Sequence, residues 1–209
     1  MTAITGSTAL WYASRATGVV SLLLLSLVVI LGILVNRQGR LPGLPSFAVT
    51  GLHRSVSLLS VLFIGVHVAT AIIDPYVNIR LAAVVIPFVS AYEPFWLGLG
   101  AVSLDLVAAL ILTSLARAHL PRRTWRGIHW LAYAAWPVAL VHSIGSSHDL
   151  RSGGLLMVAI GSALAVAAAG LWRLAASARE VPRAERAAYV LAGVQRQAHR
   201  ARAGHGGAR

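Results

Sequence analysis

Four of the eight histidines lie inside apolar stretches of the sequence, where imidazoles are uncommon. They form two pairs with nearly the same separation, because His53 and His67 are fourteen positions apart and His129 and His142 are thirteen apart. In α-helices these separations correspond to ~20 Å along the axis. If the two helices lie side by side, the histidines occupy two levels, and each level holds one residue from each helix.

Two imidazoles that face each other between helices can bind a haem iron from both sides. Such a pair leaves no open position on the iron, so it favours electron transfer. Zinc is a poorer match, because structural zinc needs about four ligands around one ion and the two levels lie too far apart. The alternative is that these histidines are inter-helix hydrogen-bonding groups or proton relays.

Long apolar segments must position these histidines. The chain of 209 residues is 57% hydrophobic and 11% charged, whereas soluble domains carry about 25% charged residues. Each segment has close to the ~20 residues that cross the hydrocarbon core of a bilayer. The sequence therefore predicts an all-α integral membrane protein, a bundle of five transmembrane helices at residues 17–35, 48–73, 97–116, 127–147 and 153–172.

The eighteen basic residues, all of them arginine, indicate the orientation of these helices. Only Arg15, Arg80 and Arg151 fall on one side of the predicted bundle, and the others fall on the opposite side. Because cytoplasmic segments carry the excess of positive charge, we expect the N-terminus outside and the C-terminus in the cytoplasm. The net charge of +12 is then a matter of topology, and we expect no nucleic-acid binding.

In this orientation the second and fourth helices run parallel. His53 and His129 then form an inner pair near the cytoplasm, and His67 and His142 form an outer pair. A separation of fourteen residues keeps two side chains on one face of a supercoiled helix. Thirteen residues leave the second side chain ~140° from the first, and Pro137 offers a kink that could reorient one end.

The chain is expected to divide into a haem-binding transmembrane domain, residues 1–174, and a basic cytoplasmic tail, residues 175–209. We expect the tail to be attracted to lipid headgroups or to dock to a soluble partner. The chain has no cysteine, which excludes disulfides and thiolate-bound clusters. Gly65 and Gly127 each precede a histidine by two positions, where either a flat macrocycle or helix packing would need close approach.

The histidine pattern resembles the ferric-reductase-like transmembrane domain, a family that includes NADPH oxidases, ferric reductases and the haem subunit of bacterial methionine-sulfoxide reductase systems. The resemblance covers roughly residues 9–174 and includes LWYASRATG in the first helix and RGIHWLAYAAWPVALVHSIG in the fourth. The composition, rich in Ala and Arg, is similar to that of small actinobacterial members. The resemblance implies a multi-pass protein of the bacterial cytoplasmic membrane.

The resemblance also implies an oxidoreductase with two haem b groups, which passes electrons from a cytoplasmic donor to an acceptor outside. The inner pair would bind one haem and the outer pair the other. Arg15, near the outer end of the first helix, and Arg54, beside His53, are the candidates for contacts with haem propionates.

The family's flavin- and nicotinamide-binding module has no counterpart here, because no G-x-G-x-x-G segment lies between a strand and a helix. We therefore expect no FAD or NADPH site in this chain and a separate electron donor: a flavoprotein, another respiratory component or quinol. Ferric iron, oxygen or a protein could be the acceptor. The alternatives are a proton-coupled channel or transporter that uses the histidines and Asp105, and a structural membrane subunit of a larger complex.

Overall fold

The computed structural model describes residues 2–36, 45–75, 77, 79–146 and 154–205. Within these residues the chain is helical and forms no strand, as the sequence predicts. The elements are α1 (Thr2–Asn36), α2 (Ser46–Ile73), α3 (Ala82–Val85), α4 (Pro94–Leu115), the 3-10 helix η1 (Ala116–His119), α5 (Arg122–His129), α6 (Ala132–Ser146) and α7 (Gly154–His205).

The chain divides into two compact units, Met1–Ala167 and Ala168–Arg209. The division falls inside α7 and precedes Leu174, where the sequence places the end of the membrane domain. In the second unit the apolar side chains of Tyr189, Val190, Leu191 and Val194 are exposed. All histidines of the two predicted pairs belong to the first unit.

Four helical segments in the described part of the chain are long and apolar enough to cross a membrane. These are Thr8–Val35, Phe47–Ile73, Pro94–His119 and Leu155–Ala176. The remaining predicted span, residues 127–147, is divided between α5 and α6. Because α6 has 15 residues, it covers only ~22 Å at ~1.5 Å per residue. Membrane insertion of this segment and the orientation of the termini stay predictions.

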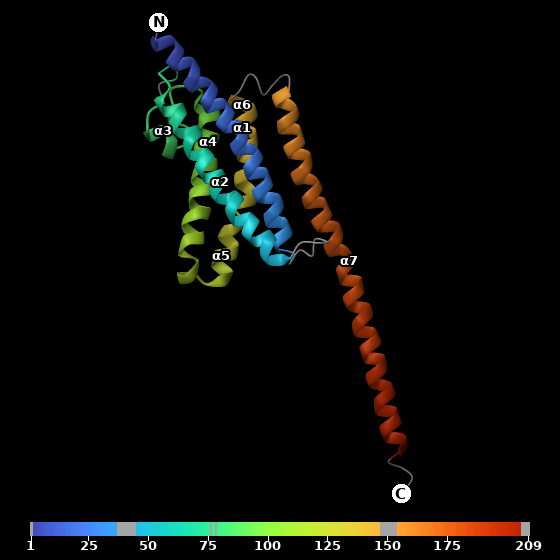
Figure 1. Ribbon diagram of the computed structural model, residues 1–209. Helices are drawn as coiled ribbons and strands as arrows, with labels where there is room; N and C mark the ends of the chain where they lie inside the picture. The colour runs from blue at the N-terminus through green and yellow to red at the C-terminus, as the bar shows by residue number, and fades with distance from the viewer. Residues whose placement is uncertain (1, 37–44, 76, 78, 147–153, 206–209) are drawn as a thin grey trace. The chain divides into compact units, whose positions relative to one another are not determined.

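In the first unit, α1 packs along α2 and α4 packs along α6, and α6 also contacts α1 (Figure 1). Apolar packing between α1 and α2 centres on Leu31, Val49 and Val56. Two polar contacts connect α6 to its neighbours. The Trp136 Nε1–H group donates to Ser26 Oγ at 2.8 Å, and Ser103 Oγ donates to the carbonyl of Ala135 at 3.3 Å.

The helix that carries His129 and His142 is interrupted. α5 ends at His129, residues 130–131 form a turn, and α6 begins at Ala132. Pro137 lies inside α6 and cannot donate a backbone hydrogen bond to the carbonyl of Tyr133. The break in the helix between the two histidines therefore lies at residues 130–131, before the proline that the sequence singles out.

The segment between α2 and α4 contains the short helix α3, which packs against α4. The apolar side chains of Leu81, Val85 and Phe88 in this segment are exposed. Phe88 has a positive φ of 67°, and its ring covers Gly98, where a Cβ atom would overlap it. This segment closes one end of the space between α2 and α4.

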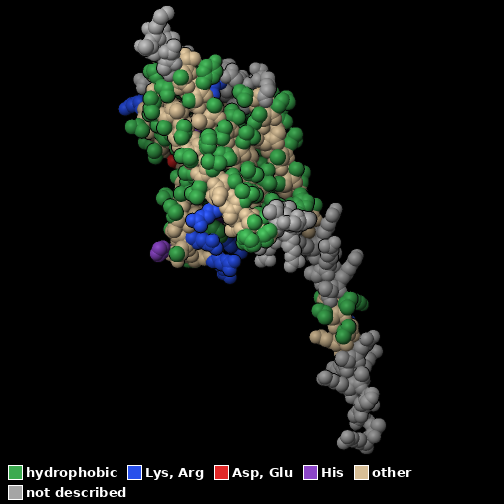
Figure 2. All heavy atoms as spheres, in the orientation of Figure 1, with side chains coloured by type: hydrophobic (Ala, Val, Ile, Leu, Met, Phe, Trp, Pro, Cys, Tyr) green, Lys and Arg blue, Asp and Glu red, His purple; other side chains and the backbone are tan. Residues whose placement is uncertain are grey.

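The surface of the bundle is mostly apolar, and arginines gather at the end that contains α5 (Figure 2). The exposed arginines of this end are Arg54, Arg117, Arg122, Arg123 and Arg126. Four others that the topology argument counts, Arg37, Arg40, Arg151 and Arg209, lie outside the described residues. The distribution of the described arginines matches the one from which the cytoplasmic side is predicted.

Candidate functional site

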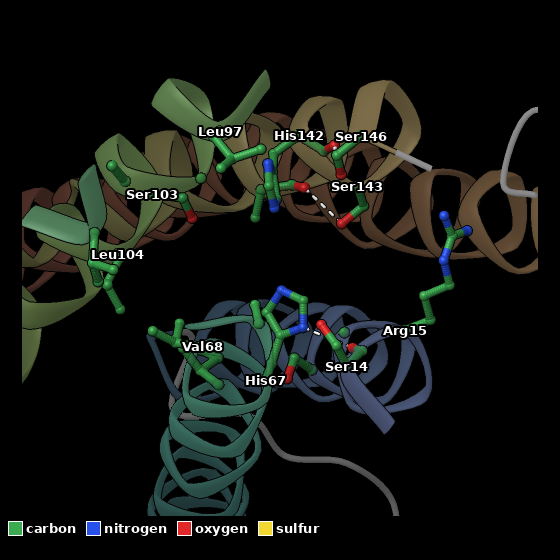
Figure 3. Close-up of a pocket in the computed structure, with 18 of the residues that line it drawn as sticks. Ser14, Arg15, His67, Val68, Leu97, Ser103, Leu104, His142, Ser143 and Ser146 are labelled. Atoms are coloured by element: carbon green, nitrogen blue, oxygen red, sulfur yellow. Dashed lines mark hydrogen bonds between the residues drawn. The ribbon is translucent and has the colours of Figure 1, made fainter. Parts of the chain in front are cut away.

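The outer pair shares one cavity. His67 from α2 and His142 from α6 both line a space of about 290 Å³, near the lower end of the ~300–1000 Å³ typical of ligand pockets. Figure 3 shows the two rings facing each other across it. The structure thus brings together the two histidines that the sequence assigns to the outer level.

Backbone carbonyls orient both outer rings. His67 Nδ1 lies 2.8 Å from the carbonyl oxygen of Ser14 in α1, and His142 Nδ1 lies 2.8 Å from that of Trp96 in α4. A carbonyl oxygen only accepts hydrogen bonds, so each Nδ1 is the donor. In a neutral imidazole, Nε2 then carries no proton and keeps a lone pair that can bind a metal.

The cavity is largely apolar, with a few polar groups on its wall. Arg15 lines it, and the Arg15 guanidinium lies 4.0 Å from the centre of the Trp11 ring. Ser143 and Ser146 of α6 line it too, but their hydroxyls donate to backbone carbonyls of their own helix. Arg15 is therefore a cation on the wall of the cavity that contains the outer pair.

The inner pair has a different environment. His53 belongs to α2, and His129 is the last residue of α5. Both Nδ1 atoms are buried, and neither has a hydrogen-bond partner among the described residues. The His129 ring instead stacks on Trp125, with ring centres 4.9 Å apart and an angle of 23° between the planes. Arg54 follows His53 directly and is exposed.

Three of the four imidazoles pack against glycines of neighbouring helices. A Cβ atom at Gly100 would lie 2.7 Å from the His142 ring, and one at Gly18 would lie 3.0 Å from the His67 ring. At Gly32 the distance to the His53 ring would be 3.4 Å. Sequence reasoning missed these glycines and the carbonyls beside them. One signal was present: Gly18 and Gly32 are fourteen residues apart, as are His53 and His67.

The glycines that the sequence does single out behave differently. A Cβ atom added at Gly65 or at Gly127 meets nothing within 4 Å. Helix packing within the described residues therefore does not require glycine at either position. The other intramembrane candidate, Asp105, has an exposed side chain on α4 and is not among the residues that line the cavity.

A sequence profile described as ferric reductase like transmembrane component matches residues 17–140. The chain belongs to the ferric reductase-like transmembrane family. Membership implies membrane electron transfer and oxidoreductase activity in general. The matched region of this ferric reductase-like protein includes His53, His67 and His129 and ends two residues before His142. No curated protein and no solved structure matches the chain.

Proposed function

We propose that this ferric reductase-like protein transfers electrons across the membrane through two b-type haems. His67 and His142 would bind the outer haem, and His53 and His129 the inner one. The observation that carries the proposal is the outer pair, in which two rings hydrogen-bonded through Nδ1 face each other across one apolar cavity. This geometry leaves both Nε2 atoms available for one metal between them.

The residues of the outer pair fit a haem better than a metal ion alone. No group of three or more His, Cys, Asp or Glu side chains that could hold a metal ion occurs among the described residues. Zinc sites usually have at least three such protein ligands, whereas axial haem ligation takes one or two. A bound haem would supply a one-electron redox couple inside the membrane.

The chain's own part in this chemistry is to hold and orient the ligands. The carbonyls of Ser14 and Trp96 fix the two outer rings through Nδ1, and such partners also raise the basicity of the coordinating nitrogen. Arg15, on the cavity wall, would pair with a propionate of the outer haem. Arg54, at the arginine-rich end, would pair with one of the inner haem.

We place the electron donor at the arginine-rich end and the acceptor at the end that contains α3. The donor would be a separate flavoprotein, another respiratory component or quinol, and the acceptor would lie outside the bacterial cytoplasmic membrane. A proton relay has less support. Asp105 would have to communicate with the histidines, yet its side chain is exposed and does not line their cavity.

A visible spectrum of the purified, haem-supplied protein tests the proposal. We expect a b-type spectrum with about two haems per chain, and about half of that absorbance in His67→Ala and in His53→Ala. His119→Ala is the matched control, because His119 is an exposed histidine outside both pairs, and it should retain full absorbance. Purified protein without Soret absorption would contradict the proposal.

A further inference from the structure

A repeated backbone arrangement surrounds the outer histidines. His67 donates from Nδ1 to the carbonyl of Ser14 and lies against Gly18, which is four residues further along α1. One helical turn separates these two positions. The missing side chain of the glycine therefore lets the imidazole approach the helix closely enough to reach the carbonyl one turn before it.

His142 uses the same arrangement on a different helix. It donates to the carbonyl of Trp96 and lies against Gly100, again four residues further on. We call this arrangement a carbonyl–glycine notch, meaning a carbonyl at one position and a glycine four positions later in the same helix. The two outer rings occupy two such notches, one in α1 and one in α4.

A third notch holds His53 more loosely. Its ring lies against Gly32, and the backbone carbonyl four residues earlier belongs to Val28. His53 Nδ1 has no hydrogen-bond partner among the described residues, in agreement with the longer ring-to-glycine distance. The notches at Gly18 and Gly32 are fourteen residues apart on α1, the same separation as between the two histidines of α2.

We infer that Gly18 and Gly100 are positioning residues that set the tautomer and ring orientation of the two outer histidines, and that Gly32 lets the His53 ring approach α1 without fixing its tautomer. His129 keeps a buried Nδ1 without a hydrogen-bond partner among the described residues, and stacking on Trp125 holds its ring instead. This inference deepens the proposed function, because ring orientation and tautomer decide how well an imidazole binds a metal.

The distance from each added Cβ atom to the nearby histidine ring predicts the relative size of the effect of each Gly→Ala substitution. A methyl group at Gly100 requires the His142 ring to move, because real Cβ contacts are essentially never below 3.0 Å. At Gly18 the fit is tight, and at Gly32 the contact is an ordinary one. We expect Gly100→Ala to disturb its histidine most, Gly18→Ala less and Gly32→Ala least.

The first test uses haem-free protein in lipid nanodiscs, labelled with ¹⁵N-histidine. Nitrogen chemical shifts distinguish protonated from unprotonated ring nitrogens, and His→Gln variants assign the signals of the eight histidines. We expect the Nδ1–H tautomer at His67 and His142, a loss of this single tautomer at His142 in Gly100→Ala, and a mixture of tautomers at His129. Gly65→Ala and Gly127→Ala are the matched controls and should leave all signals in place. Unchanged His142 signals in folded Gly100→Ala would overturn the inference.

Haem titration then connects the notches to the site. Loss of the hydrogen-bond partner of a metal-binding histidine typically weakens metal binding by about 10–100-fold. Gly100→Ala should therefore weaken haem binding at the outer site to this extent and leave the inner site unchanged. Equal weakening of both sites would count against positioning and indicate general unfolding. If no variant binds haem, the proposed function fails, while the tautomer measurements still decide the inference.

Discussion

The outer and inner histidine pairs have similar sequence spacing but different surroundings. In the outer pair both Nδ1 atoms are 2.8 Å from a backbone carbonyl. In the inner pair both Nδ1 atoms are buried without a hydrogen-bond partner in the described part of the chain. A buried polar atom without a partner costs about 1–3 kcal/mol. The outer pair is thus oriented for ligand binding to a greater extent than the inner pair.

The difference shows that matched residue types do not make matched sites. A ring held by a main-chain carbonyl is oriented before any ligand binds, and preorganisation of this kind lowers the cost of binding. The inner rings must be ordered when their ligand arrives. His129 is also the last residue before the interruption of its helix, since α5 ends there, whereas His142 lies within α6.

The largest effect expected from this comparison concerns haem retention. With excess haem-scavenging protein present, we expect the inner haem to leave at least ~10-fold faster than the outer one. Histidine ligands whose other ring nitrogen is hydrogen-bonded hold a metal about 10–100-fold more tightly. Absorbance at the Soret band should decay in two phases of equal amplitude.

Single-site variants assign these phases. His67→Ala retains only the inner haem and should show only the fast phase, whereas His53→Ala should show only the slow one. Equal rates in the two variants would mean that the carbonyl partners do not distinguish the two sites.

The apolar helices and the pairing of the histidines could be predicted from the sequence, because hydropathy and side-chain type depend only on which residues are present. It could not identify Ser14 or Trp96 as partners, since every residue has a backbone carbonyl and its use leaves no mark in the sequence. The rotation of α4 about its own axis could not be predicted from the sequence either. A helix that is apolar on all sides has no face that identifies its neighbours, so the exposure of Asp105 could not be predicted.

A medium effect is expected for a substitution at Gly145, because this glycine packs against Trp96, a residue that orients a histidine of the outer pair only. A Cβ atom at Gly145 would overlap the Trp96 ring, and the Trp96 carbonyl orients His142. Gly145→Ala should therefore destabilise the protein by about 1–3 kcal/mol, as overpacking does, and broaden the spectrum of the outer haem only. Thermal unfolding and low-temperature spectra measure both effects.

Gly161→Ala is the control for this substitution, because an added Cβ atom there meets nothing within 4 Å. The control should unfold at the same temperature or slightly higher, since alanine favours a helix over glycine by up to about 1 kcal/mol. A spectral change at the inner haem in Gly145→Ala would show that Trp96 does not act selectively on the outer level.

The smallest expected effect concerns the two arginines. Arg15 lines the cavity of the outer pair, whereas Arg54 is exposed beside several other arginines. A nearby positive charge stabilises the reduced haem, so Arg15→Gln should lower the outer midpoint potential. Two unit charges about 10 Å apart at an effective dielectric constant of about 20 interact by about 1.7 kcal/mol, which corresponds to roughly 70 mV.

Arg54→Gln should shift the inner potential by less, because water and salt screen exposed charges and neighbouring arginines remain. Spectroelectrochemical titration at low and high ionic strength separates the two arginines. The Arg15 shift should persist at high salt, since Arg15 is partly buried in the wall of a largely apolar cavity, while the Arg54 shift should disappear. A salt-sensitive shift in Arg15→Gln would place its guanidinium in solvent and remove it from the outer haem's surroundings, which would leave the histidine partners as the main difference between the two levels.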